Sequence, residues 1–178
     1  MKKIDTPFQG VFILQPDVYE DERGFFMEIY NQRKFVELSG LTIQFVQDNL
    51  AHSEYGVLRG LHYQKGEYAQ AKLVTVLKGK VQDVIVDLRR DSQTYGKYFS
   101  IILSEENKKQ LFVPRGFAHG YLSLDDDTLF YYKIDNIYHK ESEAGIYYAD
   151  KNLNIDWIIV PRLILSEKDK KLPGFKSL

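Results

Sequence analysis

Residues 72–88 of the chain, KLVTVLKGKVQDVIVDL, decide its fold class. Two runs rich in Val, Ile and Leu, KLVTVL and VQDVIVDL, flank the turn-former KGK, and this pattern is typical of β-strands. Strict alternation places Lys72 on the same face of the first strand as Val74 and Val76. An unpaired ammonium group on such an apolar face is costly, so Lys72 must have a partner or a function there.

Similar short runs recur through the rest of the sequence. They are separated by turn-formers such as RRDSQTYGK and DDD, and they read GVFIL, FVQDN, VLRGLHY, YFSIIL, QLFVP, HGYLSL and TLFYYKI. This spacing predicts an all-β protein, an antiparallel sandwich or barrel. Two helical segments interrupt it, residues 31–39 with Gly40 as a stop signal and a terminal segment from Ser166, and both are expected to be accessories to the sheets.

The composition sets further bounds. A length of 178 residues suits one domain, which we expect to span residues 1–178. The formal net charge of -1 gives no field suited to a nucleic-acid backbone or an anionic membrane. The chain has no cysteine, the segment MKKIDTPFQGVFILQPDVYE lacks an uninterrupted apolar stretch, and no apolar run approaches the ~20 residues of a spanning helix. We therefore expect a cytoplasmic protein without nucleic-acid or membrane partners.

Residues 56–64, GVLRGLHYQ, combine a strand pattern with unexpected charges. Alternation puts Arg59 and His62 on opposite faces of the strand, so the two side chains are not expected to meet. They share a pocket only if Gly60 hosts a β-bulge or a close backbone approach, which interior strand glycines often mark.

Residues 113–120, VPRGFAHG, contain the pattern Pro-x-Gly-x-x-His. It resembles the second signature of the cupin superfamily, a double-stranded jelly roll whose histidines often hold a metal. The first signature of that superfamily contains His-x-His and a later glutamate, whereas the corresponding place here reads His62-Tyr63-Gln64. With one histidine where two are needed, we predict no metal site.

Two side chains are candidates for proton transfer. Neutral imidazole, with an unperturbed pKa of ~6.5, accepts a proton at cytoplasmic pH, which makes His62 a candidate general base. The alternative for His62 is a hydrogen-bonded core histidine. Tyr132 shares strand parity with Phe130 and Ile134, so its ring is expected to face the interior, either as core packing or as a proton donor.

Two charged side chains are candidates for supporting roles. A base that removes a carbon-bound proton needs a cation near the adjacent carbonyl oxygen, where negative charge develops. Lys72 can supply it, unless its side chain only extends from an edge strand into solvent. Asp169 ends the sequence Ser-Glu-Lys-Asp, which has the form of a helix capping box. Its alternative role is a hydrogen bond to the second nitrogen of His62, which fixes the tautomer of the ring.

A further segment, DERGFFME at residues 21–28, by itself predicts only a turn at Arg23-Gly24 and a following strand. Together with other segments, in this order and spacing, it closely resembles the dTDP-4-dehydrorhamnose 3,5-epimerases. Those segments are FVQDN, GVLRGLHYQ, AQAKLVTVLKGKVQDVIVDLRRDSQTYGK, LSEENKKQLFVPRGFAHGYLSL and YYKIDNIYHKESEAGI. The resemblance covers nearly the whole chain, through Asp156-Trp157 to the final LSEKDK.

The resemblance implies a homodimer of cupin-type jelly rolls (double-stranded β-helices), in which an N-terminal segment of each chain contributes to the partner's active site. It implies an enzyme that inverts carbons 3 and 5 of dTDP-4-keto-6-deoxyglucose, both next to the ketone, to give the precursor of dTDP-L-rhamnose. It also implies that neither a metal nor a dissociable cofactor takes part.

The resemblance assigns roles by position. It implies that His62 is the general base, Asp169 its orienting carboxylate, Tyr132 the acid on the opposite face and Lys72 the residue near the ketone oxygen. It implies stacking of Tyr138 on the nucleotide and further substrate contacts at Arg23, Glu28, Gln47, Asp48, Asn49, Arg59, His119, Glu143 and Lys168, with Lys72 again among them. Gln47 and Asn49 share a strand face, so both can enter one site. Arg23 and Arg59 are expected to hold the pyrophosphate.

Three alternatives stay open from the sequence. A relative that epimerises only one carbon would carry the same histidine and tyrosine, and a 3,4-ketoisomerase would use the same barrel. From a different class, a non-catalytic module that binds sugar nucleotides would share the fold, since fold alone does not prove activity. The presence of His62, Asp169, Lys72 and Tyr132 together argues against the non-catalytic module.

Overall fold

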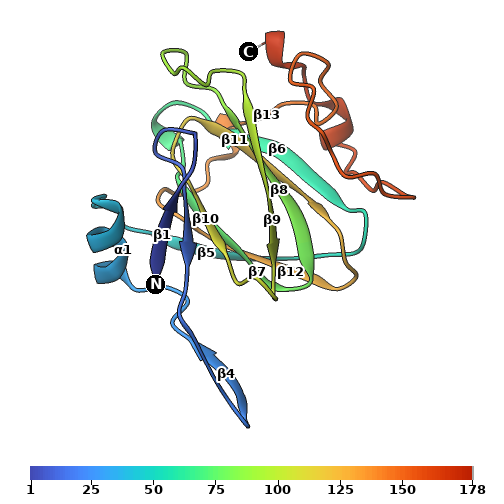
Figure 1. Cartoon of the computed structure of the whole chain (residues 1–178). Coiled ribbons are helices and arrows are strands. Elements are labelled where there is room, and N and C mark those ends of the chain that lie inside the picture. The colour runs from blue at the N-terminus through green and yellow to red at the C-terminus, as the bar shows by residue number, and fades with distance from the viewer. Residues whose placement is uncertain (178) are drawn as a thin grey trace.

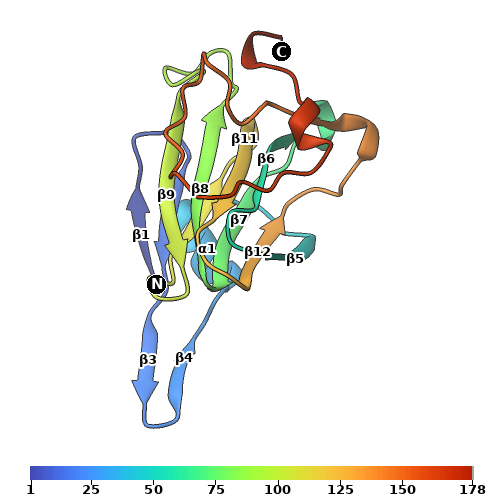
Figure 2. The same cartoon turned by 90° about the vertical axis from the view of Figure 1, so that its right-hand side faces the viewer.

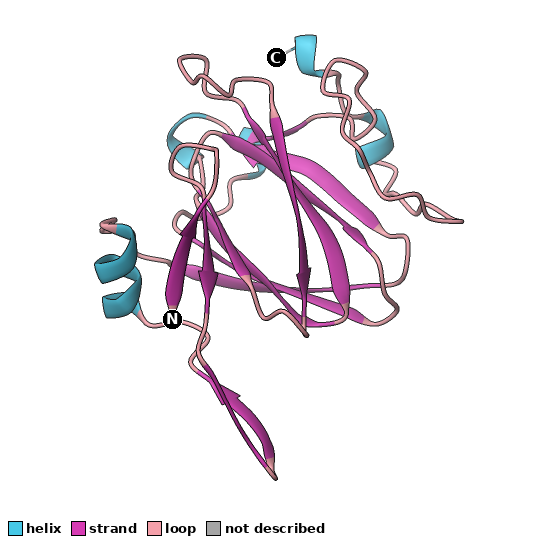
Figure 3. Ribbon diagram, viewed as in Figure 1, coloured by secondary structure: helices cyan, strands magenta, loops and turns pink. Residues whose placement is uncertain are grey.

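The computed structural model describes residues 1–177, and most of its ordered elements are β-strands arranged in two facing sheets (Figures 1 and 3). The first sheet has six strands in the order β1 (Lys2–Asp5), β2 (Phe12–Gln15), β10 (Gln110–Val113), β7 (Lys72–Lys78), β12 (Thr128–Ile134) and β5 (Gln47–Ser53). The second has five, in the order β13 (Glu143–Gly145), β6 (Leu58–Gln64), β11 (Phe117–Ser123), β8 (Lys80–Asp87) and β9 (Tyr98–Ser104). The predicted all-β class is confirmed, and within these sheets neighbouring strands pair antiparallel.

The main hydrophobic core lies between the two sheets. It takes Val74 and Val76 from β7 and Phe130 from β12 on one side, and Val81 and Ile85 from β8 on the other. These residues recur at every second position, as the alternation of a half-buried strand requires. Because Lys72 has the same parity as Val74 and Val76, its side chain starts on this inner face, as predicted from the sequence.

One α-helix, α1 (Gln32–Ser39), covers part of the outer face of the six-stranded sheet. Asn31 caps it by accepting a hydrogen bond from the backbone N–H of Lys34 at 3.2 Å, and Gly40 ends it in the left-handed conformation at φ 70°. Phe35 packs against Phe12 and Phe112 of the sheet. Both predicted ends of this helix are therefore confirmed.

The second predicted helix is much shorter than expected. Between Ser166 and residue 177 the chain forms two separate 3-10 turns, η3 (Asp169–Lys171) and η4 (Phe175–Ser177), because Leu172 and Pro173 take the backbone out of helical geometry between them. Two further 3-10 turns are η1 (Gly66–Tyr68) and η2 (Lys140–Ser142).

A two-stranded hairpin, β3 (Val18–Asp21) and β4 (Gly24–Met27), extends away from the two sheets (Figures 1 and 2). The predicted turn before Gly24 and the strand after it are both present. The sequence pattern missed β1, β3 and β13, since these strands have three or four residues and little buried alternation.

No helix within residues 1–177 is long and apolar enough to cross a membrane.

Candidate active site

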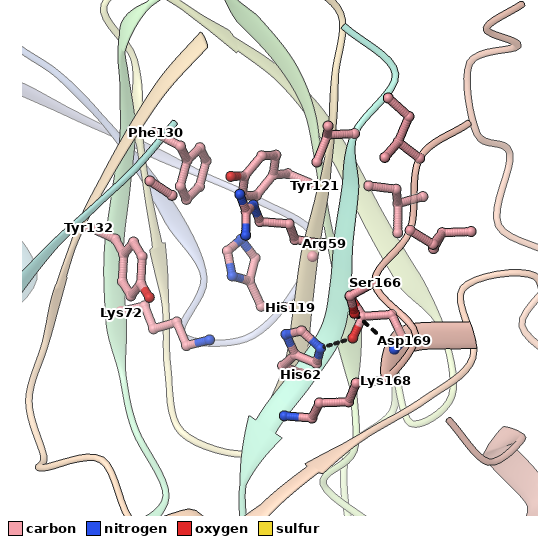
Figure 4. A pocket seen from close by; sticks show the side chains of 16 residues that line it. Arg59, His62, Lys72, His119, Tyr121, Phe130, Tyr132, Ser166, Lys168 and Asp169 are labelled. Atoms are coloured by element: carbon pink, nitrogen blue, oxygen red, sulfur yellow. Dashed lines mark hydrogen bonds and ion pairs between the residues drawn. The ribbon is translucent and has the colours of Figure 1, made fainter. Parts of the chain in front are cut away.

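A cavity of ≈ 520 Å³ opens between the two sheets. Figure 4 shows its polar lining, with Lys72 and Tyr132 on one wall and His62 and Asp169 on the other. An adjoining hollow of ≈ 360 Å³ shares His62, Lys72 and Tyr132 with it. The two spaces therefore form one continuous candidate site centred on the four residues to which the sequence assigns chemistry.

A β-bulge in β6 brings Arg59 and His62 to the same side. His62 pairs with His119 of β11, and Arg59 pairs with Tyr121. Arg59 and His62 are three positions apart on β6, whereas their partners are only two positions apart on β11, so β6 has one extra residue. The extra residue reverses the alternation, and both side chains line the cavity. The expectation from strict alternation, that Arg59 and His62 lie on opposite faces, is therefore wrong, because the strand has the irregularity at Gly60 that the sequence left as the alternative.

The backbones of β6 and β11 approach closely at this bulge. Gly60 has φ 123°, and a Cβ atom on it would lie 2.6 Å from the Cα of Gly120. A Cβ on Gly120 would lie 2.6 Å from the carbonyl oxygen of Arg59. Only glycine fits at both positions, and the geometry that aims Arg59 and His62 into the cavity depends on this fit.

His62 and Asp169 form a hydrogen-bonded pair, with His62 Nε2 at 2.6 Å from Asp169 Oδ1. The other carboxylate oxygen accepts a hydrogen bond from the Gly60 N–H at 3.3 Å. Burial raises the pKa of Asp169, but the hydrogen bonds from His62, Gly60 and Ser166 outweigh it and lower the pKa below its usual range. Asp169 is therefore ionised at neutral pH and holds His62 by one nitrogen, which leaves Nδ1 free for proton transfer.

The two roles considered for Asp169 belong to different atoms. The backbone N–H of Asp169 donates to the Ser166 hydroxyl at 3.0 Å, which is half of a capping box. The Asp169 carboxylate instead turns to β6 and is only 3% exposed. Ser166 therefore performs the capping, and the side chain of Asp169 is available to His62.

Lys72 and Tyr132 come from β7 and β12 on the opposite sheet. Burial lowers the pKa of Lys72 to about 8, against the opposing effects of the Asp83 and Glu143 carboxylates. Burial raises the pKa of Tyr132, so its phenol is protonated at neutral pH. The wall facing His62 thus presents an ammonium group and a neutral phenolic donor.

The adjoining hollow collects most of the remaining predicted contacts. Gln47 Nε2 donates to Asn49 Oδ1 at 2.8 Å, so these two β5 side chains lie together as their shared parity predicts. Glu143 accepts from the Tyr138 hydroxyl at 2.9 Å and pairs with Lys168 Nζ at 2.5 Å. Burial raises the pKa of Glu143, but the bonds from Lys168 and Tyr138 bring it below its usual range, so the group is ionised.

Three predicted contact residues lie away from this site within the chain. Asp48 points to the outer face of β5, where it pairs with Lys133 at 2.6 Å. Arg23 lies at the tip of the hairpin and bonds Asp21, and Glu28 follows the hairpin and pairs with Lys34 at 2.8 Å. Within one chain, these residues do not contact the cavity.

Sequence reasoning missed two groups that shape the site. Tyr121 lines the cavity, stacks on Phe130 with ring centroids 4.1 Å apart, and exchanges a hydrogen bond with Ser53. Its parity with His119 in β11 is a signal that could have identified it. Asp83 lies behind His119 and bonds its Nε2 at 2.9 Å. The signal for Asp83 is a carboxylate within the apolar run VQDVIVDL.

The fold and the site together define a class of protein, a β-sandwich enzyme with a cavity built for acid–base catalysis. The sequence profile of the dTDP-4-dehydrorhamnose 3,5-epimerase family matches residues 5–177. The chain belongs to this family, and it is accordingly an isomerase that acts on a nucleotide-linked sugar. The family predicted from the sequence motifs is confirmed.

Individual relatives agree with this assignment. The chain is 49% identical over 172 residues to the dTDP-4-dehydrorhamnose 3,5-epimerase of Escherichia coli K12, which covers 97% of this chain and 93% of that one. The crystal structure of the Elizabethkingia anophelis enzyme has a TM-score of 0.94 and 55% identity, covering 99% of this chain and 97% of that one. A Legionella pneumophila 3,5-epimerase in complex with dTDP-4-keto-L-rhamnose has a TM-score of 0.95 and 46% identity, covering 98% and 93%.

Proposed function

We propose that this chain converts dTDP-4-keto-6-deoxyglucose into dTDP-4-keto-L-rhamnose within the cavity between the sheets. One observation carries the proposal: the His62–Asp169 pair faces Tyr132 across the cavity, with Lys72 on the same wall as Tyr132 (Figure 4). The complex of the Legionella relative with dTDP-4-keto-L-rhamnose supports the choice of sugar nucleotide.

The proposed chemistry uses the acidity of hydrogens next to the 4-ketone. His62 Nδ1 removes the hydrogen from carbon 3 or 5, and the electron pair of the C–H bond forms the carbon–carbon double bond of an enolate. The negative charge collects on the ketone oxygen, where the Lys72 ammonium group stabilises it. The Tyr132 phenol then returns a proton to the opposite face of the carbon. Removal and return from opposite walls invert the centre. Proton exchange with solvent then returns His62 to the neutral imidazole and Tyr132 to the phenol, and the sequence is repeated at the second carbon.

The rest of the substrate extends into the adjoining hollow. Gln47, Asn49 and Tyr138 line that hollow and suit a nucleoside, since amides can hydrogen-bond a base and a phenol ring can stack on it. Arg59 stands at the cavity wall and is placed to bind the pyrophosphate. We propose these as substrate contacts, together with His119, Glu143 and Lys168.

The position of the hairpin supports a homodimer. Arg23 and Glu28 are cut off from the cavity of their own chain, and the hairpin exposes Tyr19, Phe25 and Phe26. We propose that the hairpin reaches a second copy, where Arg23 meets the pyrophosphate, and that Asp48 and Glu28 also act only in the dimer. We further propose that residues 1–178 form one domain of the cupin jelly-roll type, for which the shared core between two antiparallel sheets is the support.

The test of this function is incubation with dTDP-4-keto-6-deoxyglucose in deuterium oxide. We expect deuterium at both carbons 3 and 5, together with formation of the L-rhamnose configuration, as read by NMR and mass spectrometry. Label at one carbon would identify a single-centre epimerase. Binding without label at either carbon would contradict the proposal and favour a non-catalytic module.

The pKa of Lys72 predicts an alkaline limit to the activity. The ammonium form stabilises the enolate, and it is lost as the pH rises through about 8. We expect kcat/KM to fall above that pH, approaching tenfold per pH unit. In Lys72→Arg the guanidinium keeps its charge, so this decline of kcat/KM above pH 8, the alkaline limb of the pH profile, should disappear even though overall activity falls. A limb near pH 8 that persists in Lys72→Arg would assign it to another group.

A further inference from the structure

Asp83 is a charged residue in the core that the proposed mechanism leaves without a role. It lies on the inner face of β8, with the same parity as Val81 and Ile85, and is 0% exposed. Its Oδ2 accepts one hydrogen bond, from His119 Nε2 at 2.9 Å. Within residues 1–177, its Oδ1 has no hydrogen-bond partner. A buried carboxylate with so few partners costs stability, so packing does not account for it.

Asp87 shows what a structural carboxylate looks like on the same strand. It lies on the same face as Asp83 and is also 0% exposed. Its two oxygens accept hydrogen bonds from Arg89, Ser92 and Thr94. Burial raises the pKa of Asp87, but these bonds bring it down to about 2. Asp87 therefore fastens the loop after β8, whereas Asp83 fastens no loop.

The single partner of Asp83 is a cavity residue. His119 lines the cavity and is 6% exposed, and Figure 4 shows its ring between Arg59 and Lys72. The bond at Nε2 holds this ring in one orientation and directs Nδ1 away from Asp83. The charge of Asp83 also raises the pKa of Lys72, against the effect of burial. Asp83 thus influences two groups that share the space in which the ketone is proposed to react.

We propose that Asp83 is a positioning residue for the epimerisation, which fixes the His119 ring through Nε2 and places a buried carboxylate behind the cavity that His119 shares with Lys72. This inference rests on the proposed function of the cavity. Asp83 itself does not line the cavity and is therefore not expected to touch the substrate.

Other charged and titratable groups share the cavity with Lys72. They are Arg59 and His62 of β6, His119 and Tyr121 of β11, Tyr132 of β12, and Lys168 and Asp169 of the C-terminal segment, with Tyr63, Tyr138 and Glu143 in the adjoining hollow. Among these, Glu143 is the other group whose negative charge raises the pKa of Lys72. Because Glu143 is itself paired with Lys168, part of its charge is already balanced. Within residues 1–177, Asp83 forms no ion pair with a lysine or arginine, and its partner is His119.

The decisive variant is Asp83→Asn. The amide oxygen can still accept from His119 Nε2, and the side chain fills the same volume, but the charge is removed. We expect kcat to fall on the order of tenfold to a hundredfold, as when a carboxylate that orients a metal-binding histidine is removed. We expect the alkaline limb of kcat/KM to move to lower pH, because loss of a negative charge favours the neutral amine of Lys72. The thermal unfolding midpoint should stay unchanged or rise, since an incompletely paired buried charge is lost.

Asp87→Asn is the matched control, with the same substitution on the same face of the same strand. It should lower the unfolding midpoint and leave the alkaline limb of the folded protein where it is. Coupling to His119 is tested by a double-mutant cycle with His119→Gln, in which the two losses should be less than additive because Asp83 acts in part through the ring that His119→Gln removes.

The outcomes separate this inference from the proposed function. If the wild type fails to incorporate deuterium, the proposed function fails, and Asp83 has no reaction to support. If the wild type is active but Asp83→Asn keeps its alkaline limb, or is destabilised as much as Asp87→Asn, the inference is overturned. Should Asp83→Asn not fold, histidine ¹⁵N NMR of the wild type decides, with the His119 signals assigned from His119→Gln. The Nε2–H tautomer of His119 is expected, and the Nδ1–H tautomer would overturn the inference.

Discussion

Replacement of His62 by Asn is expected to lower turnover by roughly 10²–10⁴-fold, the contribution typical of a positioned general base. The amide fills part of the space of the ring and can hydrogen-bond Asp169, but it accepts no proton at neutral pH. Deuterium incorporation should be lost at carbons 3 and 5 alike, because one base serves both centres. The measurement is the rate of label uptake from deuterium oxide, followed by NMR at each carbon.

His52→Asn provides the control for the loss of a histidine. His52 lies on the outer side of β5, 47% exposed at its side chain, and its Nε2 lies 2.9 Å from Asp127 at the surface. Label uptake should remain at the wild-type rate in this variant. Uptake at either carbon by His62→Asn at the wild-type rate would show that another group is the base at that centre.

Tyr132→Phe distinguishes the acid from the base. Without the phenol, His62 can still remove a proton and return a deuteron to the same face, so label should enter recovered substrate while inversion is lost. This separation of exchange from inversion follows from the placement of the two groups on opposite walls. Loss of both exchange and inversion would indicate that Tyr132 is needed to form the enolate.

Asp169→Asn is the second substitution with a large expected effect, a fall in kcat on the order of 10²–10⁴-fold. In the wild type, the Asp169 carboxylate accepts a hydrogen bond from His62 Nε2, and its charge stabilises the imidazolium that forms when His62 takes a proton. The amide removes that charge and can present an N–H to the ring, which favours the wrong tautomer. Comparison of kcat with the free energy of unfolding checks this prediction.

The free energy of unfolding should respond differently to substitution of Ser166 and of Asp169, which lie in the same turn. The cap is formed by the Ser166 hydroxyl and the backbone of residue 169, so Asp169→Asn retains it. Ser166→Ala removes it and is expected to lower the free energy of unfolding by about 1 kcal/mol. A large loss of stability in Asp169→Asn with normal turnover would reverse the assignment and make the carboxylate structural.

Local periodicity determined much of the fold from the sequence alone. Alternation in KLVTVL and VQDVIVDL placed the strands and put Lys72 on the inner face, and Asn31 and Gly40 marked the ends of α1. These signals work because a strand or helix face is set by neighbours a few residues away. The order and spacing of the motifs also identified the family to which the chain belongs. Short strands such as β1 and β13 were not predicted, because they bury too few residues to produce a hydrophobic alternation in the sequence.

Contacts between distant segments were decided only by the tertiary structure. His62 and Asp169 are 107 positions apart, and whether the carboxylate would cap its own turn or reach the ring depended on where the C-terminal segment docks against β6. The bulge that joins Arg59 to His62 depends on the register between β6 and β11. The bond from His119 to Asp83 likewise needs two strands to pair. The sequence names the groups, but the pairing of strands sets the distances, and proton transfer requires those distances to be a few ångströms.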